Sequence, residues 1–154
     1  MTERGAPPTP AYGDALTAPF WDAAARHELT IQRCRACGAH QFYPRPFCLA
    51  CDSADLVWVS AAGTGTVYAM TTVHLQVSPE FEPPYVVAIV QLDEGPRLMT
   101  NIVEGGCRIG DRVQVTWRAR GDAPPLPVFR PAADGPAGGG PVSGAGKESK
   151  DGQA

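Results

Sequence analysis

Four cysteines constrain this sequence more than any other feature. They form two C-x2-C pairs separated by ten residues, and they are Cys34, Cys37, Cys48 and Cys51. Two such pairs present four thiolates from two tight turns, which is a tetrahedral donor set that zinc favours in structural sites. Gly38 follows the first pair and lets the backbone turn towards the sulfurs. The spacing therefore predicts one structural zinc ion in a small zinc ribbon.

Other chemistries use the same residue types. Two redox-active C-x-x-C pairs or two disulfides are the alternative, but two pairs joined by a ribbon-length loop favour a metal. Four cysteine thiolates also bind mononuclear iron or an iron–sulfur cluster, so the choice between zinc and iron stays open. Since four protein thiolates leave no open coordination position, we expect the ion to be structural and not catalytic. A ribbon this small has too little core to fold alone, so metal binding should supply folding energy.

Length and charge narrow the range of functions. The chain has 154 residues, 44% of them hydrophobic, which is enough for one ordinary domain or two small ones. Its formal net charge is −3 and no part of it has a basic surplus, which counts against a nucleic-acid-binding groove. Residues 1–10 lack a signal-peptide pattern and no apolar run could span a bilayer, so we expect a cytoplasmic protein.

Composition and patterning divide the chain into four parts. Residues 1–16 carry prolines and glycines and predict a flexible arm. Residues 17–60 hold the expected N-terminal helix and the zinc ribbon. Residues 61–131 predict an all-β domain. Residues 132–154 are mostly Pro, Gly, Ala and Ser with a few charges, which is typical of a disordered tail.

A helix is expected over residues 17–29. Thr17 is a suitable N-cap residue, and proline is tolerated in a first turn. The apolar side of this helix comprises Phe20, Trp21, Ala24 and Ala25. That side either covers the core of the protein or docks on a partner, and the sequence leaves both alternatives open.

Alternating patterns predict the strands. Two short strands are expected in the ribbon, at 29–33 and 40–43, and five in the second domain, at 66–77, 85–92, 97–103, 112–118 and 126–130. Five short strands separated by turn signals predict a small barrel, for which the OB fold is the five-stranded example. The strand at 85–92 is apolar on both faces. Because only one face of a small barrel points inward, the other should be covered by the ribbon, the helix or another protein.

No catalytic constellation is visible in the sequence. Phosphate-binding, dinucleotide-binding, nucleophile-elbow and metalloprotease motifs are missing. His27, His40 and His74 have no base or nucleophile nearby in sequence, and Cys107 is most simply a buried thiol. We therefore expect no catalytic residues in this chain.

A series of short motifs covers about residues 17–131 in order. They include Phe20-Trp21-Asp22, Ile31-Gln32-Arg33-Cys34, Phe42-Tyr43-Pro44-Arg45-Pro46, Gly65-Thr66-Val67-Tyr68, Leu92-Asp93-Glu94-Gly95-Pro96-Arg97, Ile109-Gly110-Asp111-Arg112-Val113 and Pro127-Val128-Phe129-Arg130-Pro131. In these motifs the chain resembles the acyl-CoA-associated zinc-ribbon/OB-fold family. The resemblance implies an N-terminal helix, a rubredoxin-like zinc ribbon and a C-terminal OB fold.

Members of that family are accessory subunits or domains. They accompany thiolase-like enzymes, including steroid side-chain aldolases, and hydratases of acyl-CoA esters. The resemblance implies a non-catalytic subunit that binds such a thiolase-like or hydratase partner and helps shape its acyl-CoA channel. Arg45 and Arg130 are then candidates for CoA contacts, because guanidinium pairs with phosphate in a bidentate way; surface solubility is their alternative role. The candidate partner contacts are Phe20, Trp21 and Tyr85.

A second class of function uses the same modules. OB folds and zinc ribbons occur in proteins that bind single-stranded nucleic acid by base stacking. Tyr68, Tyr85 and Trp117 are the aromatic candidates for such stacking. The charge balance favours the acyl-CoA hypothesis over this one.

Removal of residues 132–154 should leave folding and metal content unchanged, because this segment has too few apolar residues to offset the entropy of ordering it. Thermal melting and metal analysis of the truncated chain would test this. A large loss of thermal stability would mean that the tail packs on the core.

Overall fold

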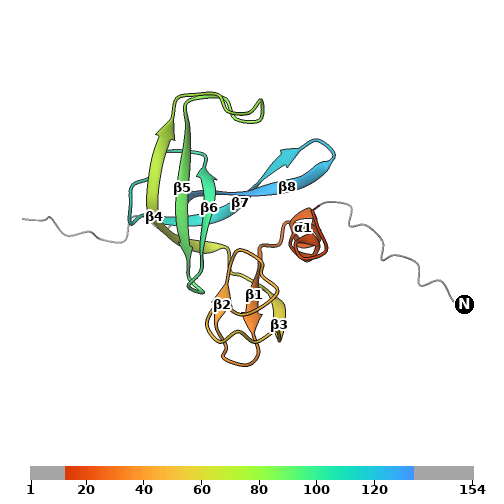
Figure 1. Cartoon of the computed structure of the whole chain (residues 1–154). Helices are drawn as coiled ribbons and strands as arrows, with labels where there is room; N and C mark the ends of the chain where they lie inside the picture. The colour runs from red at the N-terminus through yellow and green to blue at the C-terminus, as the bar shows by residue number, and fades with distance from the viewer. Residues whose placement is uncertain (1–12, 134–154) are drawn as a thin grey trace, which may run out of the picture.

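The computed structural model of the protein describes residues 13–133, which form one helix and eight strands (Figure 1). Helix α1 (Ala18–Ala25) precedes a three-stranded ribbon sheet, and a closed five-stranded barrel follows. This arrangement confirms the predicted fold class of a helix, a zinc ribbon and an OB-type barrel. Most of the expected arm and tail, residues 1–12 and 134–154, lies outside the described residues.

Helix α1 ends four residues earlier than the predicted span of 17–29. His27 adopts a left-handed φ of 60°, which an α-helix cannot accommodate. Its N–H donates to the Ala24 carbonyl at 2.8 Å, and the N–H of Glu28 donates to the Ala23 carbonyl at 3.0 Å. These two bonds form a Schellman motif, which satisfies the carbonyls of the last turn. The chain therefore leaves the helix in time to enter the first ribbon strand.

The N-terminus of α1 lacks the side-chain cap that the sequence predicted at Thr17. Thr17 makes no side-chain capping bond to the helix. Its own N–H instead donates to the Asp14 carboxylate at 2.8 Å. The apolar face also differs, because Ala25 is exposed and the buried residues are Phe20, Ala23 and Ala24. Much of the helix's apolar side thus covers the protein's own core.

The ribbon sheet has three antiparallel strands where two were predicted. They are β1 (Thr30–Cys34), β2 (His40–Gln41) and β3 (Leu56–Ser60), in the order β2-β1-β3. Strand β3 pairs with β1 along its full length. Its sequence, Val57-Trp58-Val59 at the centre, is β-branched and aromatic, a signal for a strand that the prediction overlooked. This strand returns the chain from the metal-binding turns to the barrel.

The barrel contains the five expected strands with shifted ends. They are β4 (Thr64–Val73), β5 (Tyr85–Leu92), β6 (Arg97–Ile102), β7 (Arg112–Arg120) and β8 (Ala123–Pro131). They close in the order β4-β5-β6-β8-β7. Strand β4 ends at Val73, before the predicted residue 77, so residues 74–84 form a long loop. Strand β8 begins three residues before the predicted residue 126. The N–H of Ala132 still bonds to the barrel, to the Arg112 carbonyl at 3.0 Å, so the ordered chain passes the predicted domain end.

Strand β4 does not alternate as predicted. A register shift between Val67 and Ala69 marks a bulge, after which the two faces exchange. Val67 is 1% exposed. Strict alternation over the predicted strand would place Thr71 on the same side, but Thr71 is exposed and Met70 packs on the core instead. The regular pattern of the sequence gave no sign of the extra residue.

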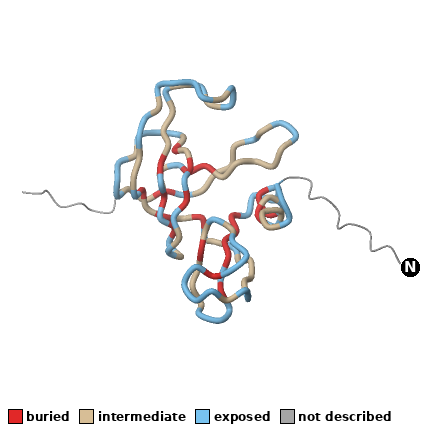
Figure 2. The backbone as a smooth tube through the Cα atoms, viewed as in Figure 1, coloured by how far each residue is buried: buried red, intermediate tan, exposed pale blue. Residues whose placement is uncertain are grey.

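One hydrophobic core joins the ribbon to the barrel. Phe20, Leu29 and Ile31 belong to the same buried cluster as Val90 and Phe129 of the barrel. In Figure 2 buried segments lie both in the ribbon and in the adjoining base of the barrel. The β4–β5 loop and the tip of the β7–β8 hairpin are coloured as exposed or intermediate. The ribbon and the barrel therefore support one another.

Strand β5 has the predicted two-sided character in part. Ala88, Val90 and Leu92 are buried inside the barrel. On the outer side Ile89 remains 37% exposed.

No helix in the described part of the chain has the length and apolar character needed to cross a membrane.

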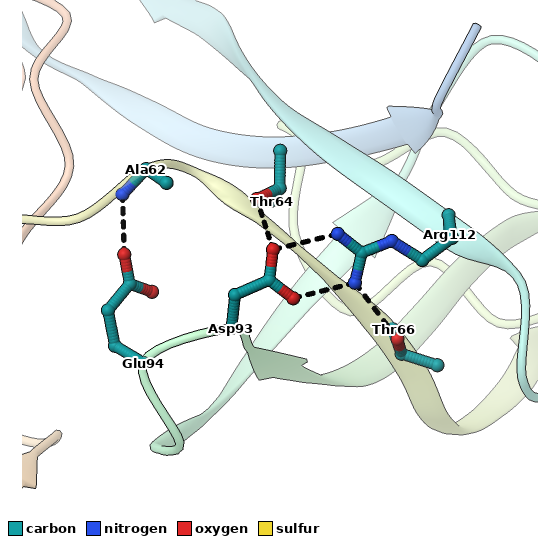
Figure 3. A network of polar contacts seen from close by, with 6 residues as sticks. All are labelled: Ala62, Thr64, Thr66, Asp93, Glu94 and Arg112. Atoms are coloured by element: carbon teal, nitrogen blue, oxygen red, sulfur yellow. Dashed lines mark hydrogen bonds and ion pairs between the residues drawn. The ribbon is translucent and has the colours of Figure 1, made fainter. Parts of the chain in front are cut away.

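A polar network closes the seam between β4 and β7 (Figure 3). These strands pair over only three residues, and there Arg112 makes two bonds to the Asp93 carboxylate, at 2.6 and 2.7 Å. Asp93 also accepts from the Thr64 hydroxyl, while Arg112 reaches the Thr66 hydroxyl at 3.3 Å. The network connects the β5–β6 turn to the first residues of β4 and β7.

This ion pair should contribute to stability. The bonds from Arg112, followed by that from Thr64, lower the pKa of Asp93 to about 2. A double-mutant cycle of Asp93→Asn and Arg112→Gln should give a coupling free energy of about 0.5–1 kcal/mol by chemical denaturation at pH 7. Since the folded-state pKa is depressed below the unfolded value of about 3.9, the stabilisation is fully present above that pH and disappears as pH falls through 2.

The control is the more exposed pair Arg26–Glu28, which has a single contact at 3.3 Å. Its coupling should be smaller. Equal coupling energies for the two pairs would contradict a special role for Asp93 and Arg112 at the seam.

Candidate metal centre and apolar groove

The four predicted cysteine ligands come together at one end of the ribbon. Their Sγ atoms all lie within 4.8 Å of one another. Cys34 and Cys51 are 3.7 Å apart, and Cys37 and Cys48 are 3.6 Å apart. A tetrahedral ion with metal–sulfur bonds of about 2.3 Å separates its sulfurs by about 3.8 Å. The cluster is therefore positioned and spaced for metal binding.

Two similar turns present the sulfurs. In the first, the N–H of Gly38 donates to the Cys34 carbonyl at 2.9 Å, and in the second the N–H of Asp52 donates to the Cys48 carbonyl at 2.9 Å. Gly38 and Asp52 both have a left-handed backbone, with φ of 77° and 59°. Aspartate is one of the few residues besides glycine that tolerates this conformation. The sequence revealed the role of Gly38, but not that of its counterpart Asp52.

The local electrostatics match a cation-binding thiolate cluster. The N–H of Cys37, and with it that of Ala36, bonds to the Cys34 sulfur and favours the thiolate. These bonds outweigh desolvation and lower the pKa of Cys34 to about 7. At Cys51 the N–H of Ser53 favours the thiolate, but the other thiols and burial raise the pKa to about 12. Four thiolates this close repel one another unless a cation lies between them, so the donor set fits a divalent metal ion.

Two buried glutamines hold the loop between the cysteine pairs. The Gln32 amide accepts from the Arg45 N–H at 2.8 Å and donates to the Arg45 carbonyl at 3.0 Å. The Gln41 amide donates to the Phe47 carbonyl at 3.1 Å and accepts from the Leu49 N–H at 3.0 Å. The two amides also bond to each other at 3.0 Å. They fix the backbone on both sides of Cys48, a role that their polar character alone did not signal.

An apolar groove of about 440 Å³ lies between α1, the ribbon and the barrel. It brings together the three candidate partner contacts, Phe20, Trp21 and Tyr85. Phe20 is only 6% exposed, so its ring forms part of the groove floor. None of the residues that line the groove is charged, and the remaining large apolar ones are Leu29, Phe42, Tyr43, Val77, Phe81, Val87, Leu98, Met99 and Leu126.

Two arginines that the sequence did not single out frame this groove. Arg118 of β7 donates to the Glu80 carbonyl in the β4–β5 loop and lies 4.8 Å from the centre of the Phe81 ring. Arg120 lies 5.2 Å from the centre of the Trp21 ring. Arg118 thus connects β7 to the β4–β5 loop, and Arg120 connects β7 to α1.

The candidate CoA-binding arginines lie in different modules. The Arg45 side chain is exposed on the ribbon loop, while its backbone is held by Gln32. Arg130 is in β8 and pairs with Glu104 at 3.3 Å. That pair offsets part of the positive charge of Arg130, whereas no ion pair involves Arg45 among the described residues.

The other singled-out residues offer little chemistry. Of the candidate stacking aromatics, Trp117 is stacked on His27 with ring centres 5.5 Å apart, and Tyr85 packs on Phe81 at 5.3 Å. Tyr68 is the exposed one, with Arg97 lying 3.5 Å above its ring. Burial, with a smaller effect of a nearby carboxylate, raises the pKa of Cys107, which makes it a weak nucleophile.

Comparison with known proteins identifies the family. The ChsH2 rubredoxin-like zinc ribbon domain matches residues 21–57, and the ChsH2 C-terminal OB-fold domain matches residues 58–118. A DUF35 domain-containing scaffold protein of Methanocaldococcus jannaschii is 33% identical over 100 residues, which are 60% of this chain and 70% of that protein. The chain belongs to the ChsH2/DUF35 family. The resemblance seen in the sequence motifs is thereby confirmed.

Two further relatives extend the comparison. The solved structure of an Ltp2-ChsH2(DUF35) aldolase is 43% identical, with a TM-score of 0.71, and the match covers 79% of this chain and 98% of that one. A probable enoyl-CoA hydratase alpha subunit of Thermomonospora curvata is 46% identical over 117 residues, or 73% of this chain. The chain spans only 37% of the length of that subunit.

The cysteine cluster yields a direct prediction. Cys48→Ser removes one of four donors and should release the bound metal ion and loosen the ribbon, because a three-thiolate site binds far more weakly. Metal analysis after dialysis and amide exchange of the ribbon would measure both effects. Cys107→Ser is the matched control, since this cysteine lies outside the cluster, and it should retain the metal. Retention of metal by Cys48→Ser would contradict the site.

Proposed function

We propose that this protein is a non-catalytic subunit that binds a thiolase-like or hydratase acyl-CoA enzyme and helps shape its acyl-CoA channel. The observation that carries the proposal is the similarity to the Ltp2-ChsH2(DUF35) aldolase, at 43% identity over 98% of that chain. The names of other relatives, a hydratase alpha subunit and a scaffold protein, support the same role. In this proposal the catalytic residues belong to the partner.

The metal in the cysteine cluster is proposed to be one zinc ion with a structural role. A zinc ribbon of four thiolates has no open position for water or substrate, and thus supplies no Lewis acid. Its contribution would be to hold the ribbon, which forms one wall of the groove through Phe42 and Tyr43. Elemental analysis that found iron in place of zinc would correct this part of the proposal alone.

The apolar groove supports a docking role. Large aromatic side chains around a concave, uncharged surface are typical of the central part of a protein interface. Tyr43, Val77 and Met99 at this groove are exposed, which leaves apolar surface for a partner to cover. The proposed partner contacts are Trp21 and Tyr85, supported by Phe20 beneath them.

Arg45 is the better candidate for a contact with CoA phosphate. The Gln32 amide holds its backbone by donating to the Arg45 carbonyl and accepting from the Arg45 N–H, so the side chain starts from a defined position. Arg130 is a weaker candidate, because Glu104 competes for its guanidinium group.

The purified protein alone should show no acyl-CoA turnover, but it should bind a co-encoded thiolase-like or hydratase subunit and raise its activity or stability. The double variant Trp21→Glu and Tyr85→Glu should weaken this association at least about tenfold, since it places charges in an apolar interface. Metal content should not change. Phe20 is left intact because it belongs to the core.

Leu75→Glu is the matched control, because Leu75 is 71% exposed and lies outside the groove. It should bind the partner as the unmodified protein does. If no such subunit associates, and the protein instead binds single-stranded DNA or RNA tightly in a salt-sensitive way, the nucleic-acid hypothesis replaces the proposed function.

A further inference from the structure

The apolar groove has one wall at the point where the described chain begins. Gly13 is the first described residue, and a Cβ atom built on it would lie 2.9 Å from Cδ1 of Trp21 and 2.5 Å from Oγ1 of Thr17. Both of these residues line the groove. Residues 1–12 are therefore joined to the structure at the rim of the groove.

A bonded turn fixes this point of attachment. The N–H of Asp14 donates to the Thr17 hydroxyl at 3.1 Å, and the N–H of Thr17 donates to the Asp14 carboxylate at 2.8 Å. The N–H of Ala18 also donates to the Asp14 carbonyl at 2.8 Å. These bonds hold the Gly13 backbone beside Trp21, so the segment that precedes it starts from a defined position.

The sequence of that segment matches the chemistry of the groove. Residues 5–12 carry no charge and include Pro7 and Pro10 in a P-x-x-P spacing. Such segments favour the polyproline II conformation and dock in grooves lined by aromatic side chains. No residue that lines this groove is charged. Its aromatic lining residues are Phe20, Trp21, Phe42, Tyr43, Phe81 and Tyr85.

The tether is short enough to make a weak contact effective. Pro10 and Pro7 precede Gly13 by three and six residues. At about 3.1 Å per residue in polyproline II, they reach about 9–19 Å from it. A short tether also raises the effective concentration to about the millimolar range, so a contact too weak for a free peptide can still occupy the groove.

The segment at the other end of the chain does not share these properties. It follows Ala132, whose N–H bonds to the Arg112 carbonyl, and neither of these residues lines the groove. Residues 134–154 carry lysines and carboxylates, and their two prolines, Pro136 and Pro141, are separated mainly by glycines. The N-terminal segment is therefore the part of the chain that fits the groove.

We propose that residues 7–10 of this chain pack into its own apolar groove, with their proline rings against the rings of Trp21 and Tyr85. The segment covers the groove in the isolated protein and leaves when a partner takes its place. Only the displacement by a partner rests on the proposed function.

Nuclear Overhauser effects in the isotope-labelled, metal-loaded full chain test the contact directly. Protons of Pro7 or Pro10 should show effects to ring protons of Trp21 or Tyr85. The double variant Pro7→Ser and Pro10→Ser should lose these effects, because serine has no ring to stack and does not favour polyproline II. It should also bind an apolar fluorescent dye, anilinonaphthalene sulfonate, at least about twofold more, since the groove is uncovered.

The double variant Pro136→Ser and Pro141→Ser is the matched control, and it should keep the contacts and the dye binding of the unmodified chain. Absence of contacts between residues 7–10 and the groove rings overturns the inference, as does equal dye binding by both double variants. Contacts found only between differently labelled copies in a mixed sample assign the groove to the segment of a second copy. Contacts from residues 134–154 assign it to the other end of the chain. Either result also overturns the inference.

Association with a co-encoded acyl-CoA subunit separates the two proposals. If the partner uses the groove, Pro7→Ser with Pro10→Ser should strengthen association about two- to tenfold, because no segment has to be displaced. Unchanged association, with the contacts present in the isolated chain, leaves the packing of residues 7–10 standing and overturns docking of the partner in the groove. Absence of any association overturns the proposed function, while the contacts still decide the inference.

Discussion

The cluster of four cysteine sulfurs is the constraint on which the rest of the molecule depends. Thiolates within 4.8 Å of one another are stable together only around a cation, so the two turns that carry them depend on metal binding. The buried amides of Gln32 and Gln41 extend this order to the loop between the cysteine pairs. The metal site and the amide network together set the position of the ribbon loop, which carries Tyr43 and Arg45.

The ribbon matters beyond its own stability because it shares a core with the barrel. Phe20, Leu29 and Ile31 are buried in the same cluster as barrel residues, so loss of ribbon order would expose apolar surface of the barrel as well. The groove lies where these parts meet. Its floor is the shared core, and its rim is formed by the ribbon loop, α1 and the β4–β5 loop. In the proposed function, a structural metal ion would in this way support a docking surface that it does not touch.

The prolines of β8 influence the wall of the groove. Pro127 has no N–H, so the parallel pairing of β6 with β8 is limited to one bridge. Beside that bridge the Thr100 hydroxyl donates to the Pro127 carbonyl, and the Met99 N–H donates to the Tyr43 hydroxyl of the ribbon loop. Side chains thus replace part of the backbone ladder where the ribbon meets the barrel.

The sequence by itself determined the local features whose cause is local. Cysteine spacing specified the metal-binding turns, alternation specified five barrel strands, and the ordered motifs specified the family. Only the tertiary structure decided features that join distant segments: the Asp93–Arg112 pair, the Gln32–Gln41 network, the missed strand β3 and the groove that unites Trp21 with Tyr85. The reason is physical, since a side chain's partner across a barrel or ribbon is set by strand order and register. Neither the bulge after Val67 nor the short pairing of β6 with β8 leaves a periodic signal in the sequence.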